Sequence, residues 1–167
     1  DADRAFVDHF AEDDNRFKDI VGAYLLLLAA LCLTWFTVAL AARATDRRVP
    51  LIAMGSVAAG AMVMAALAFL TVPLSISFGD LSDDPGVGEG QALLPQLGFT
   101  ALFAGVLVPA AVFVVLAARE PHLLPRWLAV ASYPTGALLL VAVLAFAPIV
   151  LLPAWVAAAS ITLRRRA

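Results

Sequence analysis

Long apolar runs alternate with short charged segments along most of the chain. Five runs contain no Asp, Glu, Lys, Arg or His; arginines, acidic residues, glycines and prolines separate the first four, and Pro148 alone separates the fourth from the fifth. An apolar run of about 20 residues is long enough to cross the hydrocarbon core of a bilayer as a helix. We therefore predict an all-α, polytopic transmembrane bundle of about five spans, over residues 20–42, 51–72, 95–118, 127–147 and 149–163.

The fifth span is shorter than the other four. Its roughly 15 residues, at 1.5 Å per residue, fall short of a core about 30 Å thick, so a full crossing needs local adjustment of the helices or the bilayer. Arginines follow the first, third and fifth runs, whereas residues 1–19 and the loop 79–90 are acid-rich. Basic segments stay in the cytoplasm. This pattern favours five crossings, with the N-terminus outside and the tail 164–167 in the cytoplasm.

Composition agrees with a membrane domain of residues 20–163. Of the 167 residues, 63% are hydrophobic and 14% charged, against about 45–50% and 25% in soluble domains. The mean hydropathy is +0.94. We expect a multi-pass protein of a plasma or bacterial inner membrane. Because the chain starts at Asp1, an upstream helix or signal peptide is also considered.

Several short motifs lie in the last quarter of the chain. They are LPRW at 124–127, PAW at 153–155 and SITLRR at 160–165. In these motifs the chain resembles the C-terminal ends of uncharacterised bacterial multi-pass membrane proteins. The resemblance implies a helical inner-membrane hairpin, and it transfers no active residue.

The acidic segment 1–19 carries three phenylalanines with helical spacing. Phe6, Phe10 and Phe17 can share one face of an amphipathic helix outside the membrane. A helix that binds anionic lipid would be basic, so we expect this face to contact protein. The contact is with a partner subunit; the alternatives are packing against this chain's own outer loop or fusion to an upstream helix.

The loop 79–90 carries the candidate metal ligands. Asp80, Asp83, Asp84 and Glu89 lie among glycines and a proline, and carboxylate oxygens are the ligands that calcium and magnesium prefer. Their spacing differs from that of the twelve-residue calcium loop. The alternative is a solvated acidic loop that only helps to orient the protein.

No other chemistry is indicated, and no cofactor is expected. His9 and His122 fall in segments predicted on opposite sides of the membrane, which argues against a haem held by two histidines. The span interiors lack ionisable residues, which disfavours proton-coupled transport and acid–base catalysis. The short arginine runs orient spans, so nucleic acid is not an expected partner. Trp127 and Trp155, near predicted span ends, suit interface anchoring, whereas Trp35 falls mid-span.

Small residues recur at helical spacing in the second span. The pairs Ser56–Gly60 and Ala61–Ala65 allow close approach of helices. We expect a non-enzymatic subunit or accessory protein, in contact with the lipid bilayer and with other membrane subunits or copies of itself. One alternative is a small oligomeric carrier or channel for a neutral or apolar solute or lipid. Another is a metal-dependent membrane enzyme that uses the outer acidic loop.

Overall fold

The computed structural model describes residues 13–78, 89–141 and 150–164, and the regular elements in these ranges are helices. Three helical stretches are apolar and long enough to cross a membrane, namely Phe17–Ala41, Arg48–Thr71 and Leu93–Ala118. The predicted all-α transmembrane bundle is therefore confirmed. In chain order the elements are α2 (Asp13–Ala41), α3 (Arg48–Phe78), α4 (Glu89–Thr100), the π-helix η2 (Ala101–Val106), α5 (Leu107–Ala118), α6 (Arg126–Val141) and α7 (Leu151–Arg164).

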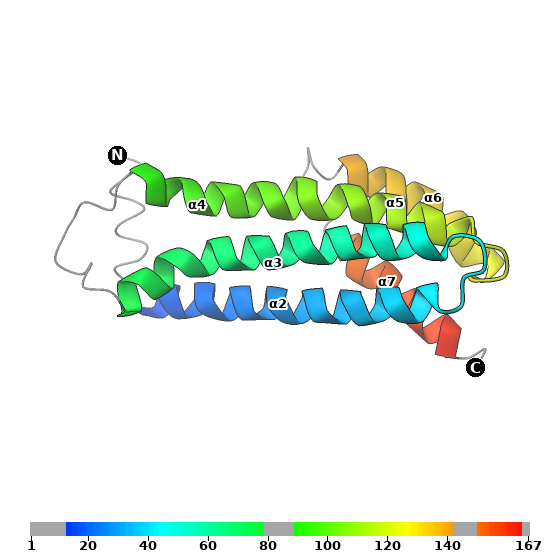
Figure 1. The fold of residues 1–167 in the computed structure, drawn as a ribbon, viewed down its shortest axis with the longest axis horizontal. Helices are drawn as coiled ribbons and strands as arrows, with labels where there is room; N and C mark the ends of the chain where they lie inside the picture. The colour runs from blue at the N-terminus through cyan, green and yellow to red at the C-terminus, as the bar shows by residue number, and fades with distance from the viewer. Residues whose placement is uncertain (1–12, 79–88, 142–149, 165–167) are drawn as a thin grey trace.

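Helix α3 is the centre of the bundle. It packs along α2 on one side and along α4, η2 and α5 on the other, and these last three form one continuous column (Figure 1). Helices α6 and α7 have 16 and 14 residues and lie in the half of the bundle where α5 ends. At 1.5 Å per residue α7 is roughly 21 Å long, so the count of five full crossings stays a prediction.

Helix boundaries extend two of the predicted spans. Helix α2 begins at Asp13, so residues 13–19, predicted as part of a separate surface segment, form its first turns. Helix α3 continues past residue 72, the predicted end of its span, through Pro73, and reaches Phe78. Residues 1–12 lie outside the described part of the chain.

The basic segments gather at one end of the bundle. The turn after α2, the turn after α5 and the end of α7 all lie at the end opposite the start of α2 (Figure 1). Six arginines of the described ranges belong to this end: Arg43, Arg47, Arg48, Arg119, Arg126 and Arg164. This is the arrangement that the positive-inside pattern predicted for one side of the membrane.

Gly55 of α3 allows α2 and α3 to pack closely. A Cβ added at Gly55 would lie 2.2 Å from Oγ1 and 2.4 Å from Cγ2 of Thr37. Of the two small pairs singled out in the sequence, Ser56 and Gly60 lie on the exposed face of α3, whereas Ala65 of the pair Ala61–Ala65 is buried. The small residues that face the interior are Gly55, Ala58, Ala59, Ala65 and Ala66.

We expect Gly55→Ala to lower the free energy of unfolding by about 1–3 kcal/mol, because the added methyl group overpacks the contact with Thr37. Gly60→Ala is the matched control, since nothing lies within 4 Å of its Cβ position. There the gain in helix propensity should stabilise by about 0.5–1 kcal/mol. Thermal unfolding in detergent measures both, and equal effects would contradict the packing described for α2 and α3.

A proline accounts for the irregular backbone of the third long helix. Pro109 has no N–H to donate to the carbonyl of Gly105, and its ring presses against that carbonyl. The chain adopts the wider π-helical form of η2 directly before α5, as membrane helices do to accommodate a proline. Gly105 also allows a close approach to α3, because a Cβ there would lie 2.8 Å from Cβ of Ala61.

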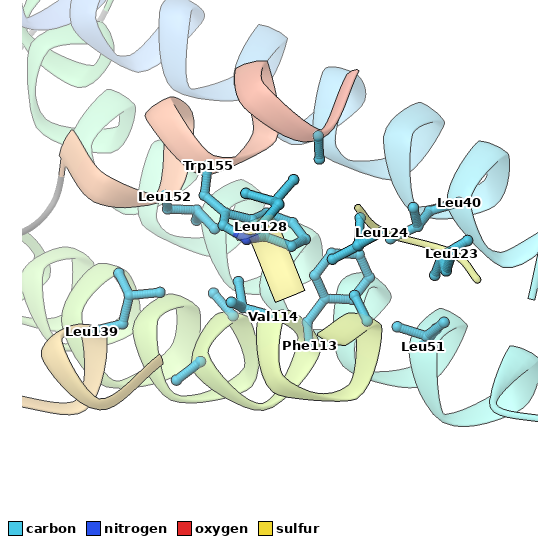
Figure 2. Packing of buried hydrophobic residues seen from close by; sticks show 14 of the residues in the cluster. Leu40, Leu51, Phe113, Val114, Leu123, Leu124, Leu128, Leu139, Leu152 and Trp155 are labelled. Atoms are coloured by element: carbon cyan, nitrogen blue, oxygen red, sulfur yellow. The ribbon is translucent and has the colours of Figure 1, made fainter. Parts of the chain in front are cut away.

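Three aromatic rings from different helices form the centre of the core. Phe36 of α2, Phe113 of α5 and Trp155 of α7 meet edge to face, with centroids 6.1–6.2 Å apart. Figure 2 shows Phe113 and Trp155 among the buried residues around them. Trp155 also donates from Nε1 to Oγ of Ser132 on α6 at 2.8 Å. The prediction of Trp155 as an interface anchor was wrong, because its side chain is only 4% exposed. Trp155 holds α7 against α2, α5 and α6.

Candidate functional site

The candidate residues chosen from the sequence lie at the end of the bundle opposite the arginines or outside the described ranges. Asp80, Asp83 and Asp84 belong to residues 79–88, which are not described, and Glu89 is the first residue of α4. The metal site therefore stays a prediction. Within the described ranges, no group of three His, Cys, Asp or Glu residues could hold a metal ion.

The phenylalanine face is described only at Phe17. Its side chain lies in the first turns of α2 and is 68% exposed. Phe6 and Phe10 fall within residues 1–12, outside the described part of the chain. The shared face of the three rings therefore stays a prediction, with Phe17 available for a contact.

The described structure instead presents a buried carboxylate that sequence reasoning passed over. Glu120 lies in the turn between α5 and α6 and is only 3% exposed. Its Oε1 accepts hydrogen bonds from the backbone N–H of Thr45, from Oγ1 of Thr45 at 2.9 Å and from the N–H of Asp46 at 2.9 Å. Its Oε2 accepts from the N–H of Arg47 at 3.0 Å. We call this set of bonds the Glu120 clasp.

The clasp supplies hydrogen-bond acceptors to backbone N–H groups of the α2–α3 turn. Backbone N–H groups at the start of a helix have no partner within the helix, and the helix dipole makes that end partly positive. Thr45, Asp46 and Arg47 directly precede α3, which begins at Arg48. A carboxylate from another turn therefore accepts from the N–H groups of the segment that leads into α3, close to the positive end of the helix dipole.

The turn that presents Glu120 has an uncommon backbone. His122 has a φ of 62°, in the left-handed region that few residues other than glycine adopt. The N–H of Leu123 donates back to the carbonyl of Glu120 at 3.4 Å. The chain thus reverses within a few residues between α5 and α6, directly beside the clasp.

Two opposing effects set the pKa of Glu120. Burial raises the pKa, because it disfavours the charged form, while hydrogen bonds from Asp46, Thr45 and Arg47 lower it. The hydrogen bonds prevail and hold the pKa of this carboxyl below its ordinary value of 4.5. Glu120 is therefore ionised at neutral pH.

We expect acid to weaken the clasp. A carboxyl whose pKa is lower in the folded than in the unfolded chain stabilises the fold above its ordinary pKa, and this contribution is lost as the pH falls through the folded pKa. The difference in melting temperature between the parent protein and Glu120→Gln should thus be constant near neutral pH and shrink below about pH 4.5. Thermal unfolding in detergent from pH 7 to pH 3 measures it. A difference that does not change with pH would contradict the role of the charge.

A second contact brings the end of α7 to the same place. Nη1 of Arg43, in the α2–α3 turn, donates to the carbonyl of Leu163 at 3.1 Å, where α7 approaches its end. An arginine near the last carbonyls of a helix complements the negative end of its dipole. In the same turn, Nε of Arg47 is buried and has no hydrogen-bond partner.

One sequence signal could have identified Glu120. It is the only acidic residue after Glu89, and it lies in a turn otherwise marked by Arg119 and Arg126. A lone glutamate in a basic turn suggests a specific partner. The partner itself could not be read from the sequence, because Thr45 lies 75 residues away.

The clasp is suited to holding the bundle together. Both carboxylate oxygens of Glu120 accept from donors of the α2–α3 turn, so the negative charge is already stabilised by contacts within the fold. The contact of Arg43 with Leu163 adds the end of α7 to the two joined turns. No protein-family model, curated protein or solved structure matches the chain.

Proposed function

We propose that this chain is a non-enzymatic integral membrane subunit or accessory protein of a larger membrane complex. We place it in a bacterial inner membrane, in line with the resemblance of its C-terminal motifs, with the arginine-bearing end in the cytoplasm. The three long apolar helices support the membrane location. The collection of six arginines at one end of the bundle supports the orientation, because basic segments are retained on the cytoplasmic side.

The proposal that the chain docks to another membrane protein rests on the exposed face of α3. Ala53, Ser56 and Gly60 are exposed on this face, and nothing lies within 4 Å of the Cβ position of Gly60. Larger exposed side chains follow at Met64 and Leu67. Between membrane helices, small residues permit close approach of the backbones and so favour packing. A helix of a partner subunit would fit against the small residues, with Met64 and Leu67 beside it.

Substitution of glycine by leucine tests this docking face. Gly60→Leu would fill the face where the partner helix is to pack. Gly22→Leu is the matched control, because Gly22 is also exposed and helical and has nothing within 4 Å of its Cβ position. Neither leucine meets other atoms of the chain at Cβ, so both variants should fold.

The measurement is gentle detergent extraction from the native membrane, followed by size-exclusion chromatography and mass spectrometry. We expect a stoichiometric membrane partner with the parent chain and with Gly22→Leu, and its loss with Gly60→Leu. Recovery of the parent chain alone, or as a homo-oligomer, would contradict the subunit proposal and favour the carrier or channel. Equal partner recovery with both variants would place the docking face elsewhere.

A further inference from the structure

The contacts at the basic end bring arginines of three separate chain segments together. The Glu120 clasp joins the α2–α3 turn to the α5–α6 turn, and the bond from Arg43 to Leu163 adds the end of α7. Each joined segment carries arginine at or beside the contact. We call these residues the arginine cluster: Arg43, Arg47, Arg48, Arg119 and Arg164.

Such a cluster is electrostatically unfavourable unless anions approach it. Like charges held close together repel, and the described part of this end has two carboxylates, Asp46 and Glu120, for the five arginines of the cluster. The carboxylate of Glu120 accepts from the N–H groups of Thr45, Asp46 and Arg47, not from a guanidinium group. Arg43, Arg48, Arg119 and Arg164 are exposed and can reach an external anion.

One guanidinium group also has a donor without an acceptor. Nε of Arg47 is buried and makes no hydrogen bond. A buried polar group without a partner costs free energy and calls for an explanation, of which a bound ion is one. Nε itself is inaccessible from outside, so an external anion would be bound by the exposed guanidinium groups around it. Because guanidinium groups match phosphate oxygens in geometry and charge, phosphate is the anion that these groups would suit.

The position of the arginine cluster indicates which kind of molecule carries the phosphate. The cluster lies where the three long apolar helices begin or end, which is the depth of the lipid headgroups. Trp127, 59% exposed in the first turn of α6, is of the type that lies at this interface. We propose that the arginine cluster binds the phosphate headgroup of an anionic phospholipid.

Lipid binding to the purified, detergent-solubilised full chain tests the proposal. Native mass spectrometry would follow titration with phosphatidylglycerol, and phosphatidylcholine would serve as the zwitterionic comparison. We expect phosphatidylglycerol to bind in preference. Removing one cluster arginine, in Arg48→Gln or Arg119→Gln, should weaken this binding about fivefold, which corresponds to about 1 kcal/mol per basic residue near a membrane surface.

The controls separate the cluster from charge in general. Arg48 and Arg119 are exposed and their side chains take no part in the clasp, so their variants should keep the parent melting temperature. Lys18→Gln removes one positive charge near the opposite end of the bundle and should leave lipid binding unchanged. Equal binding of both lipids, or equal loss with Lys18→Gln, would overturn the proposal. Full displacement of the lipid by millimolar inorganic phosphate would also overturn it, since the site would then be one for free phosphate.

Discussion

Trp155→Ala is expected to lower the free energy of unfolding by about 3 kcal/mol, the lower end of the range for removing a large buried aromatic side chain. The loss leaves a cavity between Phe36 and Phe113 and leaves Oγ of Ser132 without its donor. Lipid is as apolar as the core, so the penalty comes from lost packing more than from transfer out of water. Unfolding in mixed micelles, followed by circular dichroism, measures the change.

Trp35→Ala is the matched control for this prediction. Trp35 is 77% exposed on α2, so removing its ring leaves no cavity and should change the free energy by less than about 0.5 kcal/mol. Trp155→Phe keeps a ring in place and loses the hydrogen bond, for a cost of about 1 kcal/mol. In a double-mutant cycle that cost should disappear when Ser132 is already alanine. Similar losses for Trp35 and Trp155 would contradict the buried position of the Trp155 side chain.

Glu120→Ala is expected to lower the free energy of unfolding by about 2–3 kcal/mol. Removal of the carboxylate leaves the N–H groups of Thr45, Asp46 and Arg47 without their acceptor at the start of α3. Each buried donor left unpaired costs about 1–3 kcal/mol, and water reaching the exposed Thr45 and Asp46 recovers part of the sum. Glu120→Gln keeps one oxygen but places an NH₂ group among donors, and should cost about 1–2 kcal/mol.

Asp46→Asn is the control for the loss of one negative charge at the same end. Asp46 enters the clasp through its backbone N–H, which the substitution retains, and its side chain is exposed. We expect a change below about 0.5 kcal/mol. Chemical unfolding in detergent would compare the two sites, and an Asp46→Asn loss as large as that of Glu120→Gln would show that overall charge, not the clasp, matters.

The positions of the long helices could be predicted from the sequence because bilayer thickness sets the length of an apolar run. The face of each helix that packs inward could not be predicted from the sequence. Helix α3 is apolar on all sides, so no polar stripe distinguishes its interior from its lipid-facing surface. Ser56 and Gly60 were selected from the sequence and Gly55 was not, because only the contact of Gly55 with Thr37 in the structure shows which glycine faces α2.

The tertiary contacts of the candidate site were beyond the sequence for a related reason. Glu120 looked like one more charge in a turn, because its partners lie on a turn far away in the chain. Trp155 was assigned to the interface although it lies near the middle of the short predicted span 149–163. Its burial follows from α7 packing against α2, α5 and α6, which local pattern does not encode. The acidic loop and most of the phenylalanine face stay predictions.

The two turns that the Glu120 clasp joins are far apart in the chain, and this affects the order of assembly. The α2–α3 hairpin contains contacts close in sequence and can form as soon as both helices have been synthesised, whereas the acceptor for its turn is 75 residues further on. During synthesis the amides of that turn must therefore be hydrated until the third long helix is inserted. Closure of the clasp then marks the moment at which the first hairpin and the third helix become one cooperative unit.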